Sequence, residues 1–135
     1  MEFKNLKPLD VAKYVFQCYR EQDFSQFDKI THPECRWFFP GKIGIIPWAG
    51  EFKGMEILNF VEIIRQNLSF DYYEDKTYYE DGNTVITLCE EVFTVKSTGN
   101  KVLNKLAGFF EIEEGKIIRY FEYGDTGAME RGYTG

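Results

Sequence analysis

The spacing of apolar residues divides the chain into a helical first half and a strand-rich second half. In residues 8–22, "PLDVAKYVFQCYREQ", apolar side chains recur every three or four positions. The same pattern returns more strongly in residues 55–68, "MEILNFVEIIRQNL". This is the period of an amphipathic α-helix. Between them, "DFSQFDKI" predicts a second, shorter helix, and "CRWFF" predicts a brief strand that ends at Pro40.

After the third predicted helix, the apolar period changes to two residues, which predicts strands. Four such segments are separated by the turns "EDGN", "STGN" and "EEGK". Each turn contains a glycine, as short hairpins require where φ is positive. The segment 41–54 is rich in glycine and is predicted to be a loop. The whole order predicts an α+β fold, with three N-terminal helices packed on one face of a curved antiparallel sheet.

Length, charge and cysteine content limit the class of protein. The 135 residues predict a single domain over residues 1–135. A net charge of −6 argues against a nucleic-acid partner, which would need a basic patch. No apolar run is long enough to cross a membrane, and the first residues do not resemble a signal peptide. Three widely spaced cysteines fit reduced thiols and a cytoplasmic location. A single histidine argues against a zinc site.

Aromatic residues are unusually frequent, at 18% of the chain. The hydroxyl of Tyr and the indole N–H of Trp need hydrogen-bond partners when they are buried. The nine Tyr and two Trp residues therefore indicate a partly wet concave surface or an interface. The alternative is that the strands use aromatic residues simply because these fit a sheet. Both interpretations remain open at this point.

Five short motifs follow one another along the chain: "FKGMEILNF", "DGNTV", "TG", "EGKI" and "EYGDT". With the predicted element order, they resemble the nuclear-transport-factor-two-like superfamily over nearly the whole chain. The most similar branch is the SnoaL-like one, with ketosteroid isomerase-related proteins, polyketide cyclases and limonene epoxide hydrolase. The resemblance implies a cone-shaped fold that holds a small apolar molecule, cyclic or polyketide-like. It also implies a homodimer that pairs through the sheet face, and it implies no cofactor and no metal.

Asp125, at the end of the last predicted strand, is the first candidate for catalysis. In SnoaL-like cyclases and in the epoxide hydrolase, an acid at this place points into the cone and acts as a base. The resemblance gives Asp125 that role as general acid/base. Desolvation beside Phe121 and Tyr123 would raise the pKa of its carboxyl, which suits this work. The alternative is that Asp125 caps a C-terminal helical turn, "TGAME".

Glu91 is the second catalytic candidate and lies in the predicted strand "TLCEEVF". Alternation places Cys89, Glu91 and Phe93 on one face of this strand. The resemblance to the epoxide hydrolase puts Glu91 at the position of an Asp in its catalytic relay. It puts Cys89 at the position of the relay's Arg, so the relay is incomplete in this chain. The alternative is that the Glu91 side chain faces solvent at a sheet edge.

Further side chains are candidates for lining the cone and binding the ligand. They are Tyr14, Trp37, Trp48, Tyr72, Asn104, Phe109, Phe121 and Tyr123. One hypothesis is a cofactor-independent isomerase, cyclase or epoxide-hydrolase-like enzyme. The other is a non-catalytic module of the same fold that binds a ligand or a partner protein. Both stay open because this fold hosts enzymes and non-enzymes alike.

Overall fold

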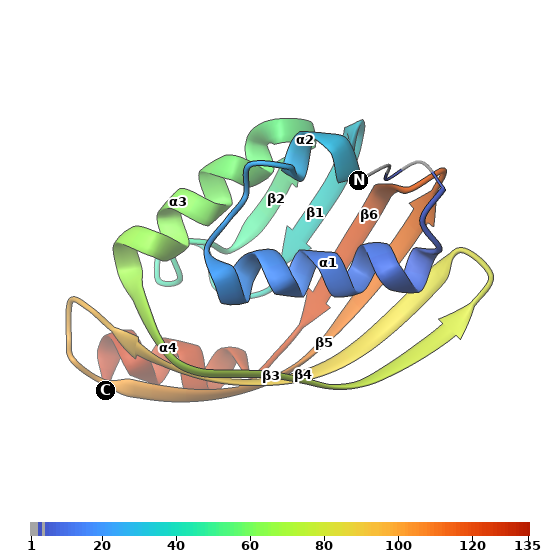
Figure 1. The fold of residues 1–135 in the computed structure, drawn as a ribbon. Coiled ribbons are helices and arrows are strands. Elements are labelled where there is room, and N and C mark those ends of the chain that lie inside the picture. Colours follow the sequence, from blue (N-terminus) through green and yellow to red (C-terminus); the bar gives the residue numbers. More distant parts are fainter. Residues whose placement is uncertain (1–2, 4) are drawn as a thin grey trace.

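The computed structural model describes residue 3 and residues 5–135, which form a six-stranded sheet with helices packed on one face (Figure 1). The elements in chain order are α1 (Pro8–Glu21), α2 (Phe27–Ile30), β1 (Thr31–Phe39), β2 (Gly50–Lys53), η1 (Gly54–Glu56), α3 (Ile57–Asn67), β3 (Leu68–Asp81), β4 (Thr84–Val95), β5 (Lys101–Glu113), β6 (Lys116–Tyr123) and α4 (Thr126–Thr134). The strands lie in the order β2-β1-β6-β5-β4-β3. The predicted α+β class is confirmed.

The sheet differs from the prediction in the pairing of its first three strands, β2, β1 and β6. Residues 41–54, predicted to be a loop, contain β2, which pairs with β1 at the edge of the sheet. Strand β1 runs parallel to β6, so the sheet is mixed rather than fully antiparallel. Gly54 allows the chain to pass close to β1, because a Cβ there would lie 2.4 Å from the carbonyl oxygen of Pro33. The remaining neighbours form the predicted antiparallel meander.

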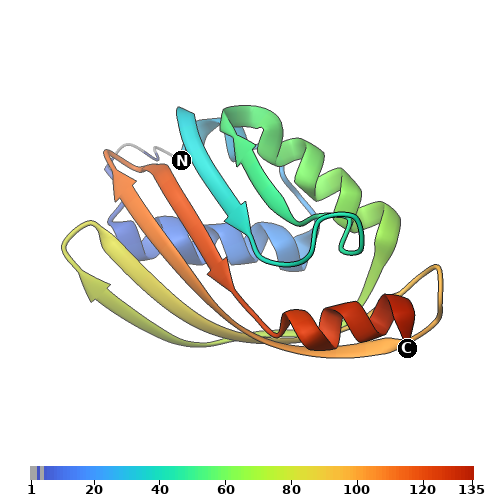
Figure 2. The ribbon, with the colours of Figure 1, turned by 180° about the vertical axis from the view of Figure 1, so that it is seen from behind.

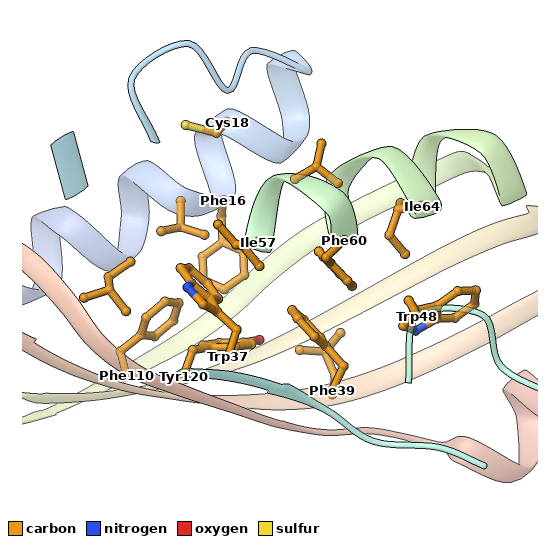
Figure 3. Packing of buried hydrophobic residues seen from close by; sticks show 14 of the residues in the cluster. Phe16, Cys18, Trp37, Phe39, Trp48, Ile57, Phe60, Ile64, Phe110 and Tyr120 are labelled. Atoms are coloured by element: carbon orange, nitrogen blue, oxygen red, sulfur yellow. The ribbon is translucent and has the colours of Figure 1, made fainter. Parts of the chain in front are cut away.

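Helices α1 and α3 each bury one apolar side against the sheet, while α2 contributes only a single short turn. Figure 3 shows Phe16 of α1 and Phe60 of α3 pointing toward aromatic side chains of the sheet. The rings of Phe60 and Phe39 stack with centroids 3.7 Å apart. Each large side chain buried in this way stabilises the fold by roughly 1.5–3 kcal/mol. The core therefore fixes both helices over the inner face of the sheet.

The C-terminal helix α4 follows β6 and lies beside the loop that joins β1 to β2 (Figure 2). Trp48 from that loop approaches Tyr133 of α4, with ring centroids 6.1 Å apart. The side chain of Met129, in this helix, is buried. The helix thus closes the inner face at the end that α1 and α3 leave uncovered. None of the described helices is long and apolar enough to span a bilayer.

Candidate functional site

A cavity of about 470 Å³ lies between α1, α3 and the inner face of the sheet. This volume is in the range of sites that hold a small organic molecule. Aromatic side chains form much of its wall, including Phe16, Tyr19, Trp37, Phe39, Phe60 and Tyr120. The packing that builds the core therefore also leaves an apolar space inside it.

Two carboxylic side chains, Glu91 of β4 and Glu122 of β6, line this largely apolar space. Glu91 faces inward because Cys89 and the next alternate residue on β4 are both buried. Glu122 faces inward because it stands two residues after the buried Tyr120. Strand β5 lies between the two strands that carry these acids. Both acids therefore reach the cavity from its floor.

Each acid accepts one hydrogen bond from a neighbouring side chain. The Tyr120 hydroxyl donates to Oε1 of Glu122 at 2.8 Å, and Nδ2 of Asn104 donates to Oε1 of Glu91 at 2.9 Å. Oδ1 of Asn104 accepts the backbone N–H of Asp125 at 2.9 Å. An N–H group needs the oxygen of the amide, so this bond turns the NH₂ group toward Glu91. The orientation of Asn104 is thus set by the backbone.

Two glycines leave room for the donors of these hydrogen bonds. A Cβ atom on Gly108 would lie 2.8 Å from the hydroxyl oxygen of Tyr120. A Cβ atom on Gly124 would lie 2.9 Å from Oδ1 of Asn104. Neither approach is compatible with normal carbon–oxygen contact distances, so any larger residue would push the donor away. Tyr120 and Asn104 therefore each pack directly against the backbone of a glycine.

Burial raises the pKa of both carboxyl groups. Desolvation raises the pKa of Glu91 to about 7, against the opposing effect of the Asn104 hydrogen bond. Desolvation also raises the pKa of Glu122 to about 8, with the charge of Glu91 adding to the rise and the Tyr120 hydrogen bond opposing it. Each negative charge disfavours the other, so the pair holds one proton near neutral pH. One acid can then donate a proton while the other accepts one.

The structure brings part of the sequence-predicted set together at this cavity. These residues are Trp37, Trp48, Tyr72, Glu91 and Asn104. The others lie elsewhere. Tyr14 packs against Phe3, with ring centroids 5.2 Å apart. Phe109, Phe121 and Tyr123 lie on the outer face of the sheet, where Tyr123 is 61% exposed.

Asp125 lies outside the cavity lining and caps α4. Its Oδ1 accepts the backbone N–H of Ala128 at 2.9 Å, and its side chain is exposed. The expectation that Phe121, Tyr123 and Asp125 share the inner face differs from the structure. Alternation along β6 turns the opposite set inward, so the inward acid of this strand is Glu122.

Sequence reasoning missed Glu122 and Tyr120, although one signal could have found them. Arg119 shares the outer face with Phe121, and its guanidinium pairs there with Glu111 at 2.9 Å. A charged residue at this position indicates which face meets solvent. Tyr19 of α1 was also missed, and its place in the cavity wall has no comparable local signal.

The described residues offer no metal centre, since no group of three His, Cys, Asp or Glu side chains lies close enough in residue 3 and residues 5–135. The three cysteines are free and buried. Cys89 contacts the hydroxyls of Thr87 at 3.3 Å and Tyr73 at 3.7 Å. Desolvation raises the pKa of its thiol to about 11, so the thiol is protonated at neutral pH.

A mixed sheet that encloses an aromatic, acid-bearing cavity beneath helices defines a protein of the nuclear-transport-factor-two-like class. Residues 11–120 match the model of the SnoaL-like domain, and the chain belongs to this family. The fold is similar to that of a nuclear-transport-factor-two-like protein from Burkholderia xenovorans, with 20% identity and a TM-score of 0.84 over 93% of this chain and 95% of that chain.

Two further solved structures share the fold at low identity. A provisionally assigned isomerase from Bacillus subtilis is 18% identical, with a TM-score of 0.79 over 96% of this chain and 97% of that chain. A provisionally assigned SnoaL-like polyketide cyclase from Mesorhizobium loti is 16% identical, with a TM-score of 0.69 over 87% and 99% of the two chains. A search of curated proteins gave no match. These likenesses establish the fold.

Proposed function

We propose that this protein binds a small apolar carbonyl compound in its cavity and catalyses proton transfer at the carbon next to the carbonyl. The cavity would be the interior of the cone that the family resemblance implies, and the chemistry would be that of a cofactor-independent isomerase or cyclase. The observation that carries the proposal is the pair Glu91 and Glu122, two acids with raised pKa that line one aromatic cavity. Perturbed carboxyls in a cleft mark functional sites.

The two acids divide the work according to their proton affinities. Glu122 holds the proton more tightly and donates it to the carbonyl oxygen. Glu91, as the ionised partner, removes a proton from the adjacent carbon, which gives an enol. Return of this proton from Glu91 to a different carbon of a conjugated enol, while the enol O–H proton returns to Glu122, yields the isomer and restores both acids. The apolar walls limit access of water, which strengthens both interactions.

Asn104 and Tyr120 act as positioning residues in this proposal, because each holds one acid through a hydrogen bond. Asp125 contributes indirectly. Its backbone N–H orients Asn104, which in turn orients Glu91. Among the described residues, neither Glu91 nor Glu122 forms an ion pair. The lack of an arginine partner favours a mechanism with one protonated and one ionised carboxyl group over a relay that needs an arginine.

A homodimer through the outer face of the sheet is a second part of the proposal. Phe109, Phe121 and Phe38 are neighbours in register across three strands, and Phe38 and Phe121 lie 6.4 Å apart between ring centroids. Leu88 and Tyr123 extend this apolar surface and are 40% and 61% exposed. Exposed apolar patches of this kind are typical of interaction surfaces. An isologous pair of sheets would cover both copies of the patch.

The catalytic proposal can be tested with β-tetralone, an apolar cyclic ketone whose α-hydrogens exchange with solvent. Exchange in D₂O is followed by NMR for the wild type, Glu91→Gln, Glu122→Gln and the control Glu90→Gln, whose side chain lies on the outer face of the same strand. We expect the wild type and the control to accelerate exchange, and either cavity variant to lose most of this acceleration. Unchanged exchange in both cavity variants would refute the assigned roles. Binding of the ketone without any acceleration would instead support the non-catalytic module.

A further inference from the structure

The rim of the cavity differs from its floor in charge. The floor carries the two acids, whereas the polar side chains toward the helix ends include Arg20, Arg65 and Lys96 against a single acid, Asp71. Arg20 lies in the last turn of α1 and Arg65 in the last turn of α3. Figure 1 shows these two helix ends approaching each other above the beginning of β3. Positive side chains therefore gather at one place on a protein whose net charge is −6.

Among the described residues, Lys96 carries the unpaired positive charge of the rim, and Arg65 forms one long ion pair. Arg20 is paired with Asp75 at 2.6 Å, and Asp71 is paired with Lys101 at 3.0 Å, so both of these rim charges are balanced. Lys96 forms no ion pair with any residue that the structure describes. The guanidinium of Arg65 contacts only Glu62, at 3.4 Å and on an exposed helix face. The rim thus has positive charge to offer a ligand.

Lys96 is also held in place at two points. Its Nζ donates to the carbonyl oxygen of Arg65 at 2.8 Å, and its backbone N–H donates to the carbonyl oxygen of Asn67 at 2.9 Å. Both acceptors belong to the C-terminal turn of α3, where free carbonyls attract a cation. This contact accounts for the position of Lys96. An ammonium group still has further N–H donors, which remain available for an anion.

We propose that the ligand is an apolar carboxylic acid whose carboxylate binds Lys96 and Arg65 at the rim while its ring system enters the aromatic cavity. This inference rests on the cavity of the proposed function and adds the polarity of its ligand. The two acids on the floor repel an anion and favour a neutral carbonyl group. The rim favours the anion. The two ends of the cavity therefore orient the ligand, with the carboxylate outward and the reacting end inward.

A matched pair of probes tests this inference, β-naphthoate and the neutral β-naphthamide, which have nearly the same shape. Trp37 and Trp48 line the cavity, so quenching of their fluorescence reports binding. We expect β-naphthoate to bind about five- to tenfold more tightly than the amide at low salt, as for a partly exposed charged hydrogen bond. Lys96→Gln should remove this preference, and Lys96→Arg should keep it. The control Lys105→Gln, on the outer face of β5, should have no effect.

The outcomes separate this inference from the proposed function. Equal binding of both probes, or an unchanged preference in Lys96→Gln, overturns the carboxylate assignment and leaves the acid pair untouched. Tighter binding of β-naphthylmethylamine than of β-naphthoate also overturns it, because a cation would then bind the floor acids. Failure of all three probes to bind refutes the binding cavity itself, and with it both proposals. A preference for β-naphthoate that declines with added salt supports the rim contact.

Discussion

Glu122 should make the folded protein lose stability as the pH rises, and Glu122→Gln should remove that loss. The carboxyl holds its proton more tightly in the folded chain, where its pKa is about 8, than at its ordinary value of 4.5. Below the ordinary value both states are protonated, so the folded state keeps its full stability. Between the two values only the unfolded chain ionises, which favours unfolding. The stability contribution is therefore lost as the pH rises toward the folded pKa.

The size of this loss follows from the pKa difference. One pKa unit corresponds to about 1.36 kcal/mol. The Glu122 carboxyl has a pKa of 4.5 in the unfolded chain and about 8 in the folded chain. This difference lowers the free energy of unfolding by about 3 to 4 kcal/mol between about pH 5 and about pH 8. This figure is an upper limit, because Glu122 borders a cavity and because its proton is shared with Glu91. Gln has nearly the same shape and can still accept the Tyr120 hydrogen bond. The substitution therefore isolates the charge.

Urea denaturation followed by tryptophan fluorescence measures the effect at several pH values. We expect Glu122→Gln to gain stability over the wild type steadily with pH, by up to about 3 kcal/mol between about pH 5 and about pH 8. Glu90→Gln, on the outer face of β4, is the matched control. A difference between Glu122→Gln and the wild type that stays constant with pH would show that Glu122 titrates alike in both states. Glu122 would then not hold a proton near neutral pH.

Three further predictions concern other parts of the molecule. Gly108→Ala should destabilise the protein by about 1–3 kcal/mol in urea denaturation, because its methyl group would displace the Tyr120 hydroxyl; no loss of stability would contradict this close packing. Asp125→Ala should cost about 1 kcal/mol as the loss of a helix cap and leave β-naphthamide binding unchanged; weaker binding would show that the cap also shapes the cavity. Phe109→Lys should convert a dimer into a monomer in sedimentation velocity, and a monomeric wild type would refute the sheet-face dimer.

The fold was predictable where the signal is local. Helices α1 and α3 carry long apolar stripes, and each hairpin of the meander has its glycine turn, as at Gly82 with φ 57°. The pairing of β1 with β6 joins residues such as Trp37 and Tyr120 that are far apart in the sequence. A parallel pair of this kind leaves no local period or turn signal. Strand β2 was hidden for a similar reason, because it is short and lies between glycines.

The orientation of β6 could not be read from alternation alone. Ile117 and Tyr120 are both buried, although they are an odd number of residues apart. The register shifts between the pairs Glu111–Arg119 and Ile112–Ile117, so β6 carries one extra residue at Ile118. Because side chains alternate with a period of two, a single extra residue turns everything beyond it to the other face. The resemblance implied that Asp125 points into the cone, whereas the structure places Tyr123 and Asp125 outside the cavity lining.

Several local departures from ordinary folding preference meet at the cavity. An apolar side chain in place of Glu91 or Glu122 would avoid the free-energy cost of burying a carboxyl group. The same desolvation raises the pKa of both acids. Gly108 in the middle of β5 has no side chain to pack, which weakens the strand. Each departure costs stability alone, yet together they place two hydrogen-bonded acids opposite aromatic walls. Sequences break such rules mainly at functional sites, so this convergence points to selection for chemistry or binding at the cavity rather than for stability.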